Sequence, residues 1–257
     1  MRKPRIYSAQ PLTSGATLAL EEGPSVHIAR ALRMRADDSL VLFDGRGSEW
    51  PAHIRQVDKK AVTVTLGERS ERSCESPLHI HLGIAISRGD RMDWIIQKAT
   101  ELGVSAITPL RSERSEVKLK GERAEKKLRH WQQIAISACE QCGRNTLPQL
   151  DALAQLTDWA SAVDAHRKYV LHHRASATAK ISATPSSIAL LIGPEGGLTD
   201  AEIAGSEQAG FSALALGPRV LRTETAPLAA IAILQARWGD MAAAAPLSTQ
   251  LDTQPHT

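Results

Sequence analysis

The sequence predicts an α/β protein in which a parallel sheet follows a small, β-rich N-terminal domain. Three observations carry this prediction. Residues 78–110 read as strand, helix and strand, the unit that builds parallel sheets. Two later apolar runs, at 187–192 and 213–216, each end at a Gly-Pro pair, and each is followed by a helical pattern. Residues 1–72 instead contain short strands separated by a turn signal.

The N-terminal domain is expected to span residues 1–72. Residues 44–47, Asp-Gly-Arg-Gly, read as a turn between two strands, because Gly and Asp tolerate the backbone angles of tight turns. A third strand is marked by the alternation of apolar and polar residues. A short helix before these strands would carry Arg30 and Arg33 on one face. The expected elements are a helix at 25–33 and strands at 39–43, 48–57 and 61–66.

Residues 67–77 are rich in Ser, with Gly and Pro, and therefore mark a connection between domains. The strand at 78–86 follows. Asp90 is suited to cap the next helix, in which apolar residues recur at helical spacing, and Gly103 is suited to end it. A strand at 104–110 completes the unit and predicts parallel pairing.

A charged loop at 112–121 and a long helix at 122–143 come next. The loop would leave the carboxyl end of a strand, where its basic side chains could meet RNA phosphates or simply lie in solvent. The apolar stripe of the helix predicts core packing. Its last turn holds Cys139-x-x-Cys142, but no second cysteine pair or histidine cluster is placed to complete a zinc site. We expect reduced, partly buried thiols and no metal.

The two Gly-Pro loops are the strongest candidates for a site. The first, at 193–197, leads to Thr199-x-x-Glu202, the signature of a capping box at a helix start. The second, at 217–222, precedes a strongly apolar helix at 227–238 that is expected to be buried or to lie in a subunit interface. Neither loop matches the glycine patterns that hold phosphates or dinucleotides. Open α/β sheets bind ligands at the carboxyl ends of their strands, and two purely structural turns are the alternative.

Composition and charge exclude several classes of protein. No apolar run approaches the length of a membrane span, and the basic start lacks an apolar core behind it, so a cytoplasmic protein without membrane contact is expected. The first 144 residues hold 24 Lys and Arg against 18 Asp and Glu, whereas the rest hold 7 against 10. A polyanion bound by the front half is one interpretation, and a solvated surface of mixed charge is the other.

The residues around the two loops resemble those of a known family. The runs 193–199 and 216–226, together with 112–115 (Ser-Glu-Arg-Ser) and 140–144 (Glu-Gln-Cys-Gly-Arg), are similar to the RsmE family of 16S rRNA (uracil-1498-N3)-methyltransferases in the SPOUT superfamily. The similarity covers nearly the whole chain to about residue 240. One departure is Asp37-Asp38, where the family pattern has Gly-Asp at a position that often needs a left-handed turn.

This resemblance implies a domain division. Residues 1–72 would form a PUA-like, RNA-binding barrel, and residues 73–240 a trefoil-knotted SPOUT methyltransferase domain with helices on both faces of its parallel sheet. Residues 241–257, rich in Ala, Pro, Thr and Gln, would form a disordered tail. The resemblance also implies a homodimer. The implied partner is 16S ribosomal RNA or the small ribosomal subunit.

The activity implied by the resemblance is transfer of a methyl group from S-adenosyl-L-methionine to N3 of a specific uridine in 16S ribosomal RNA. The cofactor would lie against the two loops. The residues expected to bind it are Leu191, Ile192, Gly193, Pro194, Glu195, Gly196, Leu216, Gly217, Leu221 and Thr223.

Two side chains of the second loop would carry the catalysis. Arg222 would position the uridine or its phosphate through its planar donor fork, and Glu224 would accept the N3 proton, with Glu195 as the second candidate. For either carboxylate, a charge that stabilises a helix N-terminus is the alternative interpretation. The side chains expected to contact RNA are Arg2, Arg5, Arg30, Arg33, Arg114 and Arg144.

Two other functions are weighed against this one. A non-catalytic RNA-binding module would use the basic front half alone and keep the Gly-Pro loops as structural turns. A nucleotide-dependent oxidoreductase on a Rossmann sheet is disfavoured, because the glycine fingerprint is missing. Binding of S-adenosylmethionine separates the first alternative from the enzyme, since a pure RNA-binding module has no use for it.

Overall fold

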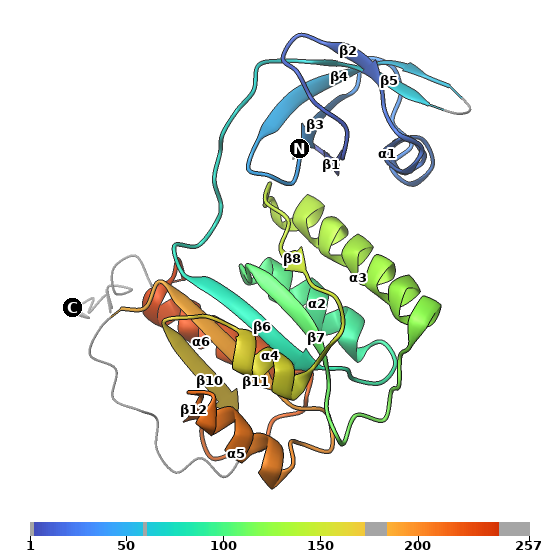
Figure 1. Ribbon diagram of the computed structural model, residues 1–257. Helices are drawn as coiled ribbons and strands as arrows, with labels where there is room; N and C mark the ends of the chain where they lie inside the picture. The colour runs from blue at the N-terminus through green and yellow to red at the C-terminus, as the bar shows by residue number, and fades with distance from the viewer. Residues whose placement is uncertain (1–2, 59–60, 173–183, 242–257) are drawn as a thin grey trace, which may run out of the picture.

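A computed structural model describes residues 3–58, 61–172 and 184–241 of the chain. The described strands form two sheets, a five-stranded sheet near the N-terminus and a seven-stranded parallel sheet in the remainder (Figure 1). The α/β class with a parallel sheet is therefore confirmed. The trefoil knot stays a prediction. Among the described helices, none combines the length and the apolar character needed to cross a membrane.

The N-terminal sheet has the strand order β1-β3-β4-β5-β2, in which only the β1–β3 pair is parallel. Alternation places Val62, Val64 and Leu66 of β5 in the core, as the sequence pattern predicts for that strand. The strands are β1 (Arg5–Tyr7), β2 (Thr17–Ala19), β3 (Ser39–Phe43), β4 (Glu49–Val57) and β5 (Val62–Leu66).

The helix expected at 25–33 begins and ends earlier than predicted. It consists of α1 (Glu22–Val26) and one π-helical segment, η1 (His27–Ala31). The chain then takes left-handed backbone angles at Arg33, with φ 53°, and at Asp37, with φ 71°. The second of these is the left-handed turn expected at the Asp37-Asp38 departure from the family pattern.

The second sheet has the order β12-β10-β11-β6-β7-β8, with β9 also paired to β7, and all of these pairs are parallel. The strand–helix–strand unit predicted at 78–110 is confirmed as β6, α2 and β7. The strands are β6 (His79–Ala85), β7 (Ala106–Arg111), β8 (Gln149–Leu150), β9 (Ala154–Gln155), β10 (Arg167–Leu171), β11 (Ser187–Ile192) and β12 (Ser212–Leu214).

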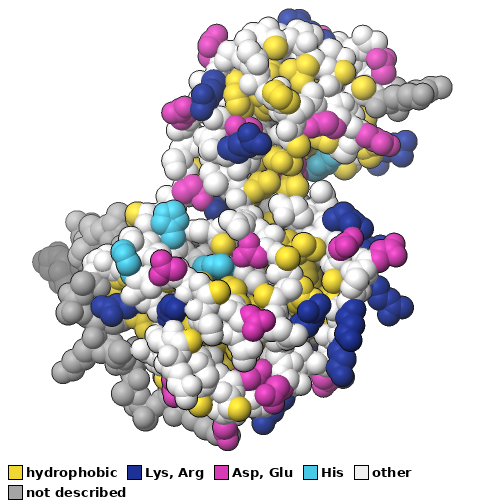
Figure 2. Space-filling view, in the orientation of Figure 1, with side chains coloured by type: hydrophobic (Ala, Val, Ile, Leu, Met, Phe, Trp, Pro, Cys, Tyr) yellow, Lys and Arg dark blue, Asp and Glu magenta, His cyan; other side chains and the backbone are white. Residues whose placement is uncertain are grey.

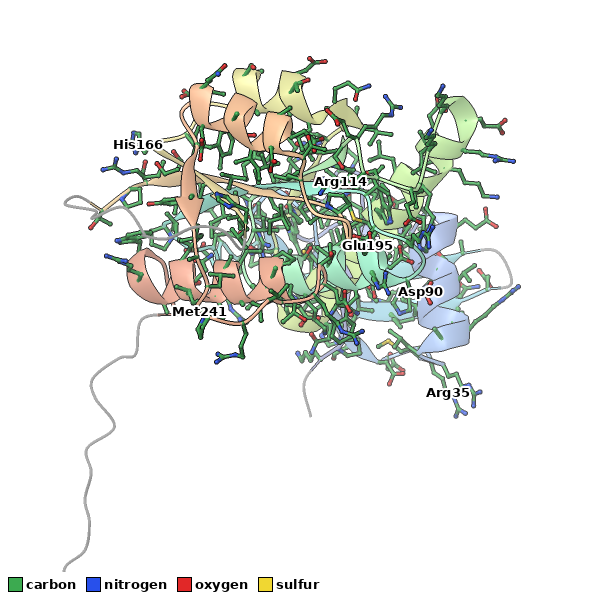
Figure 3. The ribbon with its side chains drawn as sticks, turned by 90° about the horizontal axis from the view of Figure 1, so that it is seen from below. Arg35, Asp90, Arg114, His166, Glu195 and Met241 are labelled. Carbon is green, nitrogen blue, oxygen red and sulfur yellow. The ribbon has the colours of Figure 1, made fainter. Side chains whose placement is uncertain are left out.

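Helices cover both faces of this sheet, and Figure 3 shows α5 and α6 on opposite sides of it. Alternate residues of β11 face the two layers: Leu190 belongs to the core with α2, α3 and α6, and Leu191 to the core with α4. Gly83 lets α4 pack closely, because a Cβ there would lie 2.4 Å from the Trp159 ring. The helices are α2 (Arg91–Glu101), α3 (Gly121–Cys142), α4 (Leu156–Ala162), α5 (Asp200–Gln208) and α6 (Ala226–Trp238).

The segment 144–147, directly after α3, joins the two sheets, and we call it the junction. The Arg144 guanidinium donates to the carbonyls of Thr100 at 2.8 Å and Val104 at 3.0 Å and pairs with Glu75. The Asn145 amide donates to two carbonyls of the N-terminal part, at Gly47 and Arg72. The N-terminal sheet is thus docked through main-chain groups on the end of α3 (Figure 1).

Candidate functional site

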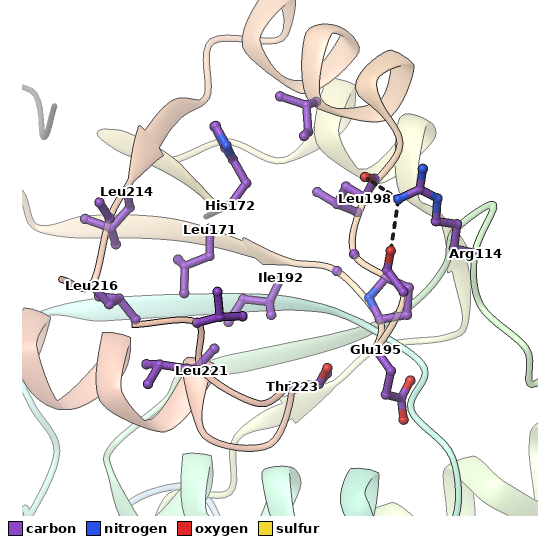
Figure 4. Close-up of a pocket in the computed structure, with 18 of the residues that line it drawn as sticks. Arg114, Leu171, His172, Ile192, Glu195, Leu198, Leu214, Leu216, Leu221 and Thr223 are labelled. Atoms are coloured by element: carbon purple, nitrogen blue, oxygen red, sulfur yellow. Dashed lines mark hydrogen bonds between the residues drawn. The ribbon is translucent and has the colours of Figure 1, made fainter. Parts of the chain in front are cut away.

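A cavity of about 330 Å³ opens where three neighbouring strands end. β10, β11 and β12 are parallel neighbours, so their carboxyl ends meet at one edge of the sheet. The loop after β11 forms one wall, the loop after β12 forms another, and the end of β10 lies between them (Figure 4). The lining residues are Arg114, Leu171, His172, Ile203, Thr223, Ala226 and the segments 192–198, 214–217 and 219–221.

The first wall, the loop at 193–198, is a compact turn held from several sides. Gly197 has a φ of 68°, which favours glycine. At Gly193 there is no room for a side chain, because a Cβ would lie 2.9 Å from the side chain of Leu198 and 3.0 Å from its backbone nitrogen. Arg114 reaches across from the loop after β7 and donates to the carbonyls of Gly196 at 3.0 Å and Leu198 at 3.3 Å. The wall is therefore fixed before any ligand binds.

The capping box predicted at the start of α5 is present and holds more than its own helix. The Thr199 hydroxyl accepts the Glu202 N–H at 3.2 Å, and the Glu202 carboxylate accepts the Thr199 N–H at 2.8 Å. The other oxygen of that carboxylate accepts the Glu113 N–H, also at 2.8 Å. Glu202 is only 4% exposed. One buried carboxylate thus fixes both the start of α5 and the loop that carries Arg114.

The second wall, the loop at 215–222, is far more open. Gly217 turns the chain with a φ of 94°, and Val220 is 80% exposed. Outside the strand pairing, no backbone hydrogen bond joins residues 215–221 to another part of the described chain. The chain is held again at Arg222, whose carbonyl accepts the N–H groups of Thr225 and Ala226 at 2.9 Å. The conformation of this loop is therefore stabilised by few contacts with the rest of the chain.

The end of β10 supplies two lining residues that no sequence motif marks. Leu171 adds to the apolar wall, and His172 places both ring nitrogens in buried positions without a hydrogen-bond partner among the described residues. The parallel pairing of β10 with β11 brings these two residues to the same edge of the sheet as the first loop.

A charged network lies beside the two walls, where α2 begins. The Arg91 guanidinium lies 2.8 Å from Glu195 and 3.7 Å from Glu224, and the Arg88 N–H donates to Glu195 at 3.1 Å. Burial raises the pKa of Glu195, but N–H groups of its own backbone and of Arg88, together with the Arg91 guanidinium, lower it by more. The pKa of Glu195 therefore lies below its ordinary value. Figure 4 shows this side chain turned away from Leu171.

Nine of the ten residues predicted to bind a cofactor line the cavity. The tenth, Leu191, does not, because its side chain is fully buried in the core with α4. The two predicted catalytic residues, Arg222 and Glu224, flank the lining residue Thr223 without lining the cavity themselves. Arg222 is exposed and Glu224 is half-buried.

The arginines expected to contact RNA fall into four groups. Arg2 lies outside the described residues. Arg30 and Arg33 are exposed at and after η1, in positions open to a partner. Arg114 is exposed, but its guanidinium already binds the first wall.

For the other two arginines the RNA prediction is wrong. Arg5 is 7% exposed, pairs with Glu49 at 2.5 Å and lies over the Phe43 ring, with 5.2 Å between the guanidinium carbon and the ring centroid. Arg144 is 4% exposed, and its guanidinium is taken up by carbonyls and Glu75 at the junction. Both are cations buried between the sheets, where a phosphate cannot reach them.

The Cys139-x-x-Cys142 pair holds free thiols. A hydrogen bond from Cys139 lowers the pKa of Cys142 to about 6, and the same contact, together with burial, raises the pKa of Cys139. In the part of the chain that the structure describes, no cluster of His, Cys, Asp or Glu is suited to hold a metal ion.

Family models match both parts of the chain. A model of an RNA methyltransferase domain matches residues 74–235, and a model of an RNA methyltransferase PUA domain matches residues 26–67. The ribosomal RNA small subunit methyltransferase E of Buchnera aphidicola subsp. Schizaphis graminum is 37% identical over 243 residues, covering 93% of this chain and 98% of the relative. The protein of that name from Bacillus subtilis is 34% identical over 236 residues, covering 88% and 92%.

Two solved structures are similar along almost the whole chain. A methyltransferase from Legionella pneumophila, in complex with the bound cofactor SAM, has a TM-score of 0.89 and 43% identity and covers 93% of this chain and 100% of that one. A ribosomal RNA small subunit methyltransferase E from Neisseria gonorrhoeae, bound to S-adenosyl methionine, has a TM-score of 0.86 and 40% identity and covers 93% and 99%.

Proposed function

This chain belongs to the ribosomal RNA small subunit methyltransferase E family, and from that premise we propose that it methylates N3 of one uridine in 16S ribosomal RNA with S-adenosylmethionine as donor. The observation that carries the proposal is the cavity between the two Gly-Pro loops, at the carboxyl ends of three parallel strands. Relatives from Legionella pneumophila and Neisseria gonorrhoeae, both similar over the whole fold, were solved with this donor.

The cavity suits such a donor in size and lining. Its volume of about 330 Å³ falls within the range of small-molecule sites, roughly 300–1,000 Å³. Leu171, Ile192, Leu214, Leu216 and Leu221 offer apolar surface to a purine ring, and the backbone of the two loops offers polar groups to the rest of the molecule. The donor would supply an electrophilic methyl group on a sulfonium.

The acceptor must be presented outside an RNA helix, because N3 of uridine lies on the edge that pairs with another base. Arg222 is exposed next to the cavity. Its guanidinium has no hydrogen-bond or ion-pair partner among the described residues. Its planar donor fork is suited to the uracil oxygens or to the uridine phosphate. Arg222 would therefore hold the base in line with the methyl group.

The N3–H group is a weak acid, so methyl transfer needs a proton acceptor. Glu224 lies one residue beyond the lining residue Thr223, whereas Glu195 lines the cavity itself. Glu195 is less suited, because its lowered pKa makes it a weaker base and its carboxylate is already bonded to Arg88 and Arg91. Glu224 would therefore take the proton while Glu195 keeps the first loop in place.

The RNA would approach along the basic side of the molecule. Figure 2 shows Lys and Arg side chains gathered beside α3, below the N-terminal sheet. Arg30 and Arg33 add two exposed cations on the N-terminal domain. Basic side chains of this kind bind phosphates without reading sequence. The homodimer stays a prediction, and Ile233 of α6, 50% exposed, would belong to its contact.

Two measurements test the proposal. Calorimetry should detect binding of S-adenosylmethionine to the purified chain, and an absence of heat would favour a non-catalytic RNA-binding module instead. Mass mapping of 16S ribosomal RNA from a strain that lacks this protein should reveal one methyl group missing from one uridine. Wild-type chain should restore it. A map that does not change on deletion would sink the N3 assignment.

A further inference from the structure

Arg91 connects the two walls of the cavity from outside. It is the first residue of α2, and its guanidinium contacts Glu195 of the first loop at 2.8 Å and Glu224 of the second at 3.7 Å. Among the described basic side chains, Arg91 alone forms an ion pair with either carboxylate. The Arg91 side chain thus bridges the loops that follow β11 and β12.

The position of this cation is not explained by α2 itself. A helix N-terminus carries partial positive charge, so a cation in the first turn is unfavourable. The Asp93 carboxylate of the same turn is bonded to His130 at 2.7 Å and Trp131 at 2.9 Å, and no ion pair joins it to Arg91 among the described residues. Glu195 and Glu224 do explain the position of Arg91, because its guanidinium compensates the negative charges of both carboxylates.

We propose that Arg91 is a positioning residue for methyl transfer, which sets the Glu224 carboxylate at the mouth of the cavity by tying it to Glu195. This inference rests on the proposed function, because it takes Glu224 as the acceptor of the N3 proton. The Arg88 N–H supports the same arrangement by holding Glu195 at 3.1 Å. The β6–α2 turn therefore braces the cavity from one side, as Arg114 does from the other.

The effect on turnover should be separable from stability. The side chains of Arg91, Glu195 and Glu224 are 43%, 33% and 24% exposed. Ion pairs this exposed contribute little to folding. Replacement of Arg91 should therefore leave the thermal midpoint close to that of the wild type and act mainly on the placement of Glu224.

The first experiment compares Arg91→Gln and Arg91→Lys with a matched control, Arg167→Gln. Arg167 is an exposed arginine at the first position of β10, at the end of that strand away from the cavity. We expect Arg91→Gln to lower kcat about 10- to 100-fold, as a misplaced catalytic group does, with KM for RNA within twofold. Arg91→Lys keeps the charge and should recover part of the loss, and Arg167→Gln should match the wild type. A higher KM for RNA at unchanged kcat would overturn the proposal by making Arg91 an RNA contact.

A double-mutant cycle asks whether Arg91 acts through Glu224. In the Glu224→Gln background, Arg91→Gln should lower kcat no further, because the group that it positions is already gone. Losses that multiply in the double variant would overturn the inference.

A readout without catalysis separates this inference from the proposed function. If the wild type binds the donor but methylates no uridine, the proposed function fails, and hydrogen exchange then decides the role of Arg91. Arg91→Gln should speed exchange of the Thr225 and Ala226 amides, which bond to the Arg222 carbonyl, several-fold over Arg167→Gln. Equal exchange in the two variants would show that Arg91 does not hold the second loop.

Discussion

The two Gly-Pro loops begin alike and are held very differently. The first is fixed by Arg114, by the capping box of α5 and by the close contact at Gly193, all in place without a ligand. The second, at 215–221, lacks such bonds among the described residues and carries the 80% exposed Val220. One wall of the cavity is therefore held by many contacts with the rest of the chain, and the other by few.

This division suits a site that must admit two ligands. A rigid wall reduces the conformational entropy lost when the donor binds, because that part of the pocket is already ordered. An open wall lets a splayed-out base enter, and it carries Arg222 and Glu224, which would complete the site on closure. The variants below test this division, from the largest expected effect to the smallest.

Arg222→Ala should have the largest effect, a loss of at least about 10³-fold in kcat/KM for RNA, as for removal of a charged group that aligns and stabilises the transition state. Its side chain is exposed and supports no fold contact, so the circular dichroism spectrum and thermal midpoint should not change. Donor affinity, measured by calorimetry, serves as the control. Turnover within tenfold of wild type would mean that the open loop does not carry the positioning group.

Glu224→Gln should lower kcat about 10²-fold, the usual contribution of a general base. The amide keeps the size of the side chain, and Glu224 does not line the cavity, so affinity for the donor should be retained. Single-turnover methylation of a 16S fragment is the measurement. Unchanged turnover would remove the assignment of the base and leave Glu224 as a charge at a helix start.

Gly193→Ala and Gly217→Ala compare the two walls directly. At Gly193 a Cβ would overlap with Leu198, so we expect a loss of about 1–3 kcal/mol in unfolding free energy and tenfold weaker donor binding. At Gly217 a Cβ meets nothing within 4 Å, and only the φ of 94° opposes it, which costs about 1 kcal/mol in a loop free to adjust. Urea unfolding measures the loss of unfolding free energy in each variant. A larger loss for Gly217→Ala than for Gly193→Ala would contradict the comparison of the two walls.

Glu195→Gln should produce the smallest effect, and one that depends on pH. Because folding lowers the pKa of Glu195, its ionised form stabilises the protein above the ordinary value of 4.5 and stops doing so as pH falls through the folded-state value. The thermal midpoint of the wild type should therefore exceed that of the variant by a constant, small amount above about pH 5. That gap should shrink under more acidic conditions, and a gap that widens there would contradict the role of Glu195.

Elements with local signals could be predicted from the sequence. β11 has the bounds expected from its apolar run, and the capping box at Thr199 and Glu202 is where its motif places it. The helix before β3 was mislocated, because no strong cap or periodicity marks its start and η1 continues it with π-helical bonds. Short elements depend on tertiary contacts that sequence patterns do not contain.

The candidate site was predictable where it is made of backbone and unpredictable where it depends on distant side chains. Gly193 and Gly217 stand out because glycine itself signals unusual geometry. Arg5 and Arg144 look like any other basic residue, and only their burial against Glu49 and Glu75 reveals a structural role. Arg91 likewise carries no motif, because its partners come from loops more than a hundred residues away.

The junction after α3 has a consequence for the choice of target. Arg144 and Asn145 bond to carbonyls on both sides of it, so the N-terminal sheet and the cavity are held at a constant separation. The N-terminal sheet and the cavity are therefore two possible contact surfaces at a fixed distance from each other. If RNA contacts both the N-terminal sheet and the cavity, this separation favours an RNA whose folded backbone spans the same distance.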